Sequence, residues 1–227
     1  MTDKADKEVV LMKPYSFGAY NKIGETEQYI RITEGCPNQC AYCAEPAEFK
    51  VFGVPEIVRN DVKIMDMNLL AKPEALAIIR DLGSRLVDGK VVYYELICGI
   101  DYRFLTPELA AALKAARFVK MRLAWDWGFA EQKRIKHAVD MMQTAGFRDL
   151  SAFMICNWRI TYEECLRKMD LCKVWRVKIC DCYFDNQLSP HIEPRFWTAD
   201  QIKDFRHRCR KHNQLVNFGI DPEFKTI

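Results

Sequence analysis

Residues 28–43 read QYIRITEGCPNQCAYC, and this stretch decides how the rest of the chain is interpreted. Its first six residues, rich in Ile, Tyr and Thr, predict a β-strand. The loop that follows supplies three cysteines, Cys36, Cys40 and Cys43, within eight residues. Thiolate sulfur is a ligand for iron–sulfur clusters and for zinc, and Gly35 permits a sharp turn of the backbone. The stretch therefore predicts a strand followed by a metal-binding loop.

The number of cysteines in this loop bears on which metal it holds. A structural zinc site usually has four protein ligands, and the sequence offers no second CxxC pair or nearby histidine to supply the fourth. A four-iron cluster held by three cysteines instead leaves one iron open to a further ligand. The spacing therefore favours a [4Fe–4S] cluster on Cys36, Cys40 and Cys43, with structural zinc or inert thiols as the alternatives.

Strand-like and helix-like segments alternate along most of the chain. Short runs rich in Val, Ile, Tyr and Phe predict strands at residues 28–33, 62–66, 90–97, 118–125, 151–156 and 174–180. Segments of helical period predict helices at residues 73–87, 107–116, 129–145, 162–172 and 199–212. This alternation predicts parallel strands joined by right-handed crossovers, and so an α/β fold that is either a β/α barrel or a doubly wound sheet.

Several predicted helices begin at a threonine suited to capping. Thr106 precedes a proline at the first helical position. Thr161 with Glu164 and Thr198 with Gln201 each fit the reciprocal capping box, in which each side chain bonds the backbone N–H of the other residue.

Polar residues recur after the predicted strands. In parallel α/β folds, chemistry collects at the carboxyl ends of the strands, although loops are polar in any case. The residues at these positions are Asp66, Asn68, Asp101, Arg103, Asp126, Asn157, Asp181 and Asp185. No linker rich in Gly, Ser or Pro divides the chain, so we expect one domain over residues 28–227 after an N-terminal extension over residues 1–27.

The composition limits the class of protein. The chain has 227 residues, of which 49% are hydrophobic, and its net charge is only +3, so no overall field demands a nucleic acid or a membrane as partner. No apolar run reaches membrane-spanning length, since Glu95 interrupts the longest candidate. Ten cysteines without an export signal are typical of thiols kept reduced. We expect a soluble cytoplasmic protein that does not engage a membrane.

The cysteine loop resembles the signature of the radical S-adenosylmethionine (radical SAM) superfamily, CxxxCx(aromatic)C, with Tyr42 as the aromatic residue. The resemblance implies a single-domain partial (β/α)6 barrel, similar to a TIM barrel, with the cluster on the loop after its first strand. It also implies two cofactors, the [4Fe–4S] cluster and S-adenosylmethionine chelated to the open iron. One electron, from a donor such as a flavodoxin or ferredoxin, would cleave S-adenosylmethionine to a 5′-deoxyadenosyl radical that abstracts hydrogen from an unidentified substrate.

The resemblance extends, more weakly, over about residues 28–183. The sequence IMDMN at residues 64–68 is similar to the elongator-like, methylthiotransferase-like and cobalamin-associated branch, and it replaces the Gly-Gly-Glu of other members. The resemblance implies that cofactor contacts come from Tyr42, Asp66, Asn68, Asp126 and Asn157. The stretch GIDYRFLTPELAAAL resembles the substrate-side loop of the branch and implies substrate contacts, and hence catalytic roles, for Asp101 and Arg103; alternatively, these two residues only pair with each other.

The remaining features leave alternatives open. The other cysteines, Cys98, Cys156, Cys165, Cys172, Cys180, Cys182 and Cys209, are typical of buried core thiols, with a second cluster as the alternative. The helix predicted at residues 199–212 places an apolar stripe opposite a basic face that would suit nucleic acid, or that is simply solvated, formed by Arg206, Arg208, Arg210 and Lys211. Three functions follow: a radical SAM enzyme acting on a small molecule or nucleotide, one that modifies RNA, DNA or protein, and a non-catalytic zinc or redox-sensing domain.

Overall fold

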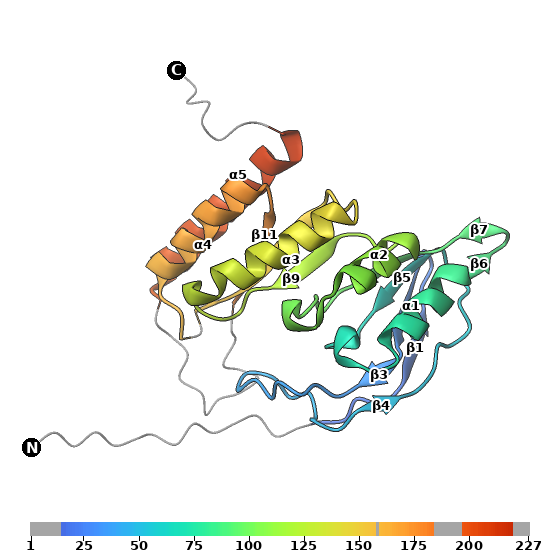
Figure 1. The fold of residues 1–227 in the computed structure, drawn as a ribbon. Coiled ribbons are helices and arrows are strands. Elements are labelled where there is room, and N and C mark those ends of the chain that lie inside the picture. The colour runs from blue at the N-terminus through green and yellow to red at the C-terminus, as the bar shows by residue number, and fades with distance from the viewer. Residues whose placement is uncertain (1–14, 158, 184–196, 220–227) are drawn as a thin grey trace, which may run out of the picture.

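Parallel strands form the centre of the molecule (Figure 1). The computed structural model describes residues 15–157, 159–183 and 197–219. One sheet has the order β1-β2-β5-β8, with strands β1 (Tyr20–Ile23), β2 (Glu27–Arg31), β5 (Asp61–Ile64) and β8 (Tyr93–Leu96). Another has the order β11-β10-β9, with strands β9 (Met121–Ala124), β10 (Leu150–Cys156) and β11 (Lys178–Tyr183). All pairings in these sheets are parallel except that of β1 with β2, so the predicted α/β fold with parallel strands is confirmed.

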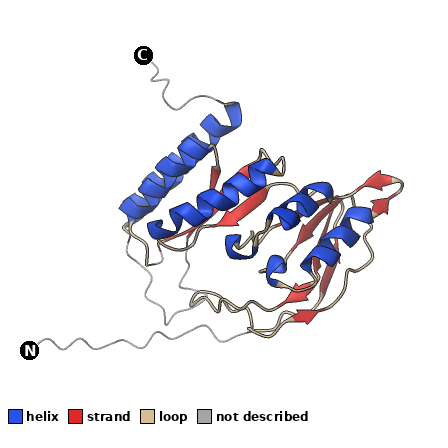
Figure 2. Cartoon of the chain, in the orientation of Figure 1, coloured by secondary structure: helices blue, strands red, loops and turns tan. Residues whose placement is uncertain are grey.

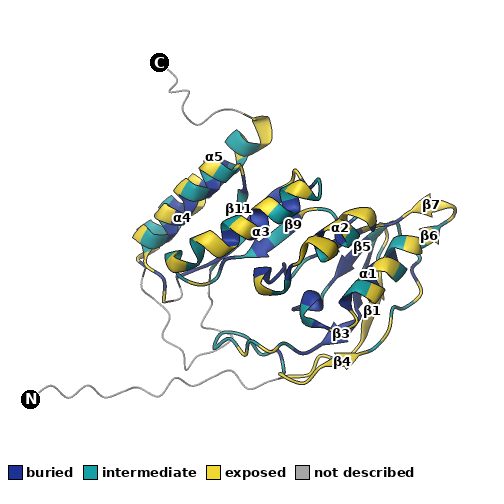
Figure 3. Ribbon diagram, in the orientation of Figure 1, coloured by how far each residue is buried: buried dark blue, intermediate teal, exposed yellow. Residues whose placement is uncertain are grey.

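Helices connect most of the successive parallel strands and pack against the sheets (Figure 2). They are α1 (Ala75–Ser84), α2 (Pro107–Ala115), α3 (Gln132–Thr144), α4 (Tyr162–Trp175) and α5 (Ala199–Phe218). Short 3-10 turns, η1 (Leu69–Ala71), η2 (Tyr102–Phe104) and η3 (Phe129–Glu131), follow β5, β8 and β9. Figure 3 shows that each helix buries one side and exposes the other, as amphipathic helices on a sheet do.

The two sheets adjoin between β8 and β9. Isolated parallel bridges join Tyr94 to Phe118 and Ile100 to Leu123. The spatial order of the parallel strands therefore follows the chain, from β2 through β11. Strand β1 adds an antiparallel edge to β2, and it comes from the stretch that the sequence assigned to an N-terminal extension.

Two predicted boundaries were wrong for identifiable reasons. The predicted strand 90–97 is split, because Lys90–Val91 form strand β7 of a small hairpin with β6 (Leu86–Val87), and only then does β8 begin. The hairpin turns at Asp88 and Gly89, whose φ angles of +49° and +72° are those of the Asp-Gly turn that suits a two-residue hairpin loop. The same hairpin shortens the predicted helix 73–87, which ends at Ser84.

The strand predicted at 174–180 begins later, at Lys178. Trp175 belongs instead to the last turn of α4, where its ring stacks on that of Trp125 with centroids 5.6 Å apart. The helix then ends at Arg176, which adopts the left-handed conformation with φ +55°. Aromatic packing between α4 and the loop after β9 thus overrides the β-propensity of Val174 and Trp175.

The capping predictions are largely confirmed. Thr106, Thr161 and Thr198 each accept a hydrogen bond from a backbone N–H of the first helical turn. The reciprocal capping box is present at Thr198 with Gln201. At Thr161 it was wrong, because the Glu164 carboxylate accepts a hydrogen bond from the backbone N–H of Phe129 instead.

The two faces of the strands differ in chemistry. Side chains alternate along β5, so Val62 and Ile64 are fully buried on one face while Lys63 lies on the other. There its ammonium pairs with the Glu95 carboxylate at 2.8 Å, and the Arg122 guanidinium pairs with the same carboxylate. The strands therefore carry an apolar face toward the helices and a charged face on the opposite side. Within the described residues, no helix has the length and hydrophobicity needed to span a bilayer.

Phe205 tests how much α5 contributes to stability. Its side chain is fully buried and packs on Trp197, with ring centroids 5.2 Å apart. We expect Phe205→Ala to lower the free energy of unfolding by about 3–5 kcal/mol, measured by urea denaturation. The matched control is Phe218→Ala in the same helix, which is 76% exposed and should change stability by less than about 0.5 kcal/mol. Equal effects of the two substitutions would contradict the packing described for α5.

Candidate functional site

The three-cysteine loop is closed at its base by backbone pairing. Strand β3 (Thr33–Glu34) pairs antiparallel with β4 (Lys50–Val51), so the two ends of the loop between them lie next to each other. Inside the loop, the Cys36 N–H donates to the Pro46 carbonyl at 2.8 Å, and the Cys43 N–H donates to the Cys40 carbonyl at 2.9 Å. These hydrogen bonds fix the backbone conformation of the segment that carries the cysteines.

A buried ion pair closes the loop a second time. One guanidinium nitrogen of Arg31, on β2, lies 2.8 and 2.6 Å from the two carboxylate oxygens of Glu45, just beyond the last cysteine. Both side chains are at most 5% exposed. The Gly35 N–H donates to the same carboxylate at 2.7 Å. Sequence reasoning missed Glu45, whose role depends on a contact that spacing does not reveal.

Gly35 is required where it stands. Its φ of +98° lies in the region that other residues avoid, and a Cβ there would lie 2.1 Å from the Glu48 carbonyl oxygen. The Lys72 ammonium donates a hydrogen bond to the Gly35 carbonyl. The turn into the cysteine segment therefore has no room for a side chain at residue 35, and its carbonyl is bonded.

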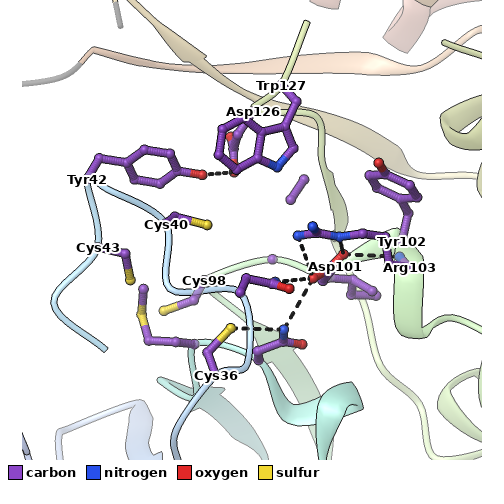
Figure 4. A pocket seen from close by; sticks show the side chains of 16 residues that line it. Cys36, Cys40, Tyr42, Cys43, Cys98, Asp101, Tyr102, Arg103, Asp126 and Trp127 are labelled. Atoms are coloured by element: carbon purple, nitrogen blue, oxygen red, sulfur yellow. Dashed lines mark hydrogen bonds and ion pairs between the residues drawn. The ribbon is translucent and has the colours of Figure 1, made fainter. Parts of the chain in front are cut away.

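The three predicted cysteines line one pocket together with a fourth. The pocket has a volume of about 100 Å³, and Cys98 joins Cys36, Cys40 and Cys43 in its lining. Figure 4 shows these cysteines on one side of the pocket, with Asp101 and Arg103 across from them. Sequence reasoning placed Cys98 among core thiols, although its position directly after a parallel strand was a usable signal.

Two thiols of this pocket resist ionisation in the metal-free protein. Burial raises the pKa of Cys43 to about 11 and that of Cys98 to about 11. The Cys98 thiol also donates to the Met65 carbonyl, with sulfur and oxygen 3.6 Å apart. A positive metal centre would reverse this preference for any thiol that it binds, because coordination favours the thiolate.

The spacing of the thiols is informative about the metal. Within residues 15–157, 159–183 and 197–219, no three Cys, His, Asp or Glu side chains lie close enough to hold a single metal ion. A lone zinc ion, with Zn–S bonds of about 2.3 Å, would need its sulfur ligands roughly 3.8 Å apart. In a cluster each thiolate binds a different iron, so wider spacing is tolerated.

Asn68 connects the cysteine loop to the opposite wall. Its side-chain amide lies 3.3 Å from the Cys36 sulfur and 3.3 Å from an Asp101 carboxylate oxygen. The side chain is buried, and its oxygen has no hydrogen-bond partner among the described residues. A buried acceptor without a donor is costly, and it marks a place where a ligand donor would be stabilised.

Asp101 and Arg103 form an ion pair that also lines the pocket. The guanidinium lies 2.8 and 2.9 Å from the two Asp101 oxygens, and the amide of Asn38 donates to the same carboxylate. The mutual pairing that the sequence left as an alternative is therefore present, and the substrate contact stays a prediction. Asn38, within the cysteine loop, was not singled out from the sequence.

Tyr42 and Asp126 meet across the pocket. The Tyr42 hydroxyl donates to the Asp126 carboxylate at 3.0 Å, and its ring packs against Trp127. The fully buried Lys168 donates to the carbonyls of Trp125 and Trp127, on either side of Asp126, the former at 3.0 Å. Lys168 therefore fixes the backbone from which Asp126 projects, a role that the sequence did not indicate.

Two predicted cofactor contacts lie outside the pocket lining. Asp66 is fully buried, and its carboxylate accepts from the Ile32 N–H, the Thr33 N–H and the Thr33 hydroxyl, at 2.6–2.8 Å. Asp66 therefore ties the end of β5 to the end of β2. Asn157, at the end of β10, has φ +65° and a buried side-chain oxygen with no partner in the described part of the chain.

The remaining predicted residues are distributed elsewhere. Asp181 lies on β11, and Asp185 lies outside the described residues. The basic face of α5 is solvent-exposed, and it comprises Arg206, Arg208, Arg210 and Lys211. Of the cysteines away from the pocket, Cys180 and Cys182 are half-buried and the others are buried as predicted, namely Cys156, Cys165, Cys172 and Cys209.

Comparison with known proteins identifies a shared fold. No protein-family model and no curated protein matches the sequence. Among solved structures, the chain is similar to "Coproporphyrinogen III oxidase (HemN) from Escherichia coli", which is described as a radical SAM enzyme. The TM-score is 0.51 at 11% identity, over 70% of this chain and 41% of that chain. At this identity the likeness shows the fold, and the matched part spans about two fifths of the other protein.

The Arg31–Glu45 pair can be tested by removing one charge. Glu45→Gln leaves Arg31 buried without its counter-ion, so we expect the free energy of unfolding to fall by about 3–5 kcal/mol. For the cluster predicted on this loop, the iron retained after anaerobic reconstitution should also fall, because the loop loses its second closure. Urea denaturation and iron analysis measure the two effects. Glu48→Gln is the control: that side chain is 78% exposed, and its substitution should leave both quantities unchanged.

Proposed function

We propose that this chain is a radical SAM enzyme that binds a [4Fe–4S] cluster through Cys36, Cys40 and Cys43. The observation that carries the proposal is that these three cysteines, in the CxxxCxxC spacing, line one pocket beside the buried Asn68 oxygen, which finds no donor within the described part of the chain. The fold shared with a radical SAM enzyme supports it. On this proposal, the two parallel sheets are the halves of a partial (β/α)6 barrel with the site at the carboxyl ends of its strands.

The residues of the pocket fit the proposed cofactors chemically. Three thiol side chains suit an iron–sulfur cluster, and the unpaired Asn68 oxygen suits the ammonium group of S-adenosylmethionine. When bound, the cluster supplies the single electron that cleaves the sulfonium of S-adenosylmethionine. A one-electron donor such as a flavodoxin or ferredoxin is the partner that this chemistry needs.

The side chains around the thiols have distinct proposed roles. Tyr42, Asp126 and Trp127 form one wall, where the Tyr42–Asp126 hydrogen bond joins the cysteine loop to the end of β9 and limits the entry of water. On the opposite wall, the Asp101 carboxylate accepts hydrogen bonds from the amide of Asn68 and from the Arg103 guanidinium and orients both. Asn157, with its unpartnered oxygen, is the proposed adenosyl contact beyond β10. The Asp66-Met67-Asn68 ending of β5 supports membership of the elongator-like, methylthiotransferase-like and cobalamin-associated branch.

A second candidate rests on Cys98. This residue supplies the fourth sulfur that a closed zinc site would need and that the sequence did not reveal. The hydrogen bond from its thiol to the Met65 carbonyl supports the cluster, with Cys98 as a neighbour that is not a ligand. Elemental analysis of protein prepared without air separates the two: iron and sulfide support the enzyme, and tightly held zinc without iron supports the closed site.

Substitution of Cys40 tests the cluster directly. We expect Cys40→Ser, reconstituted anaerobically with iron and sulfide, to lose the iron–sulfur absorption and the formation of 5′-deoxyadenosine from S-adenosylmethionine. Cys180→Ser is the matched control, because Cys180 is also a half-buried thiol but lies outside the pocket lining. Its iron content should equal that of the parent. Undiminished cleavage in Cys40→Ser would overturn the proposal.

Substitution of Asn68 separates the two cofactors. Asn68→Ala removes the unpaired acceptor but none of the three thiols, so we expect the affinity for S-adenosylmethionine to fall about tenfold, which is about 1.4 kcal/mol. Iron content should change little. Equilibrium binding to the reconstituted protein measures the first and iron analysis the second. Unchanged affinity would exclude Asn68 as a contact.

A further inference from the structure

A larger groove lies beside the candidate pocket. It runs between η2 with the start of α2 on one side and the first turns of α3 on the other, and its volume is about 610 Å³ against about 100 Å³ for the pocket. Both helices begin at the end of the molecule where the parallel strands end, so the groove opens on the same side as the cysteine loop. Its volume falls in the range of small-molecule sites.

The groove is lined by basic side chains. Arg103, Lys133, Arg134 and His137 line it, and none of its described lining residues is an Asp or Glu. The two arginines have carboxylate partners, since Arg103 pairs with Asp101 and Arg134 lies 3.4 Å from Glu131. Within the described part of the chain, Lys133 forms no ion pair. The Lys133 ammonium, the outer N–H groups of the two arginines and the His137 ring are therefore available to an anionic ligand.

The other lining side chains are mainly apolar. Leu105, Pro107 and Met141 supply aliphatic surface next to the cations, and Tyr102 supplies an aromatic ring. A ligand with an anionic group and a carbon skeleton would find complementary surface for both parts. A solvated helix face, by contrast, offers charge without such a concave apolar lining.

The groove and the pocket share a wall. Tyr102 and Arg103 line both cavities. The Tyr102 hydroxyl donates to the Glu131 carboxylate, which ties η2 to the turn that precedes α3 and fixes this wall in place. The groove and the cysteine pocket therefore adjoin at Tyr102 and Arg103.

We infer that this groove binds the phosphate group of a small phosphorylated substrate, through Arg103, Lys133, Arg134 and His137, and presents the rest of the molecule to the cysteine pocket. The naming of the occupant as substrate rests on the proposed function, whereas anion binding by the groove does not. Phosphate suits the site better than carboxylate because donors from two separate elements can bond to its three terminal oxygens.

Phenyl phosphate is a suitable probe, since it combines a phosphate with an apolar ring, and phenol is its uncharged counterpart. Calorimetric titration of the full chain should detect phenyl phosphate and not phenol. The double variant Lys133→Glu/Arg134→Glu should weaken phenyl phosphate binding at least tenfold. The control Lys203→Glu/Arg210→Glu makes the same charge change on exposed positions of α5 and should alter the affinity less than twofold. Far-UV circular dichroism confirms that both variants are folded.

Two outcomes would overturn the inference. One is that phenyl phosphate does not bind. The other is that both double variants weaken its binding equally, because the effect would then come from the net charge of the protein and not from contacts in the groove. A single-stranded oligonucleotide that competes for the groove more tightly than phenyl phosphate would replace the small-molecule substrate with nucleic acid. The proposed function is tested separately by measuring formation of 5′-deoxyadenosine without added substrate. If the double variant at Lys133 and Arg134 still forms 5′-deoxyadenosine but no longer binds phenyl phosphate, the groove serves substrate binding and not the cleavage of S-adenosylmethionine.

Discussion

A buried contact between Arg31 and Glu45 holds the cysteine loop to the first parallel strand, and the candidate site depends on it. The loop carries three thiols that repel one another when ionised, so its ends need a firm anchor. The pair fixes one end of the loop to β2, and the Gly35 N–H joins the other end to the same carboxylate. A buried pair of this kind costs about 3–5 kcal/mol when broken, a large part of the 5–15 kcal/mol that stabilises a typical domain.

Around this anchor, residues from successive strand ends complete the pocket. Asp66 bonds the backbone where β2 ends, and Lys168 bonds the carbonyls on either side of Asp126. Both are buried polar groups whose hydrogen bonds are satisfied by the main chain, so they fix positions without facing the cavity. Asn68 does face it, and its side-chain oxygen has no hydrogen-bond partner among the described residues. Positioning and binding are thus assigned to different residues.

The sequence predicted what depends on local pattern. It identified the parallel α/β class, the cysteine loop, the caps at Thr106 and Thr198, and the buried thiols of the core. It did not reveal Glu45, because its role depends on a contact between distant segments that no spacing encodes, and it missed Cys98 although that residue directly follows a parallel strand. The hairpin at residues 86–91 is different, since its Asp-Gly turn was present in the sequence and was outweighed by the apolar run that follows it.

Cys98 and the three loop cysteines bring four thiols to one small cavity. In the absence of metal, an oxidant can join two neighbouring thiols into a disulfide. Such a crosslink would pin the loop and block the cavity while leaving the fold intact. Exposure of the purified chain to air would therefore consume the free thiols that the proposed cluster needs, so the order of reconstitution and oxidation decides whether the site can be loaded.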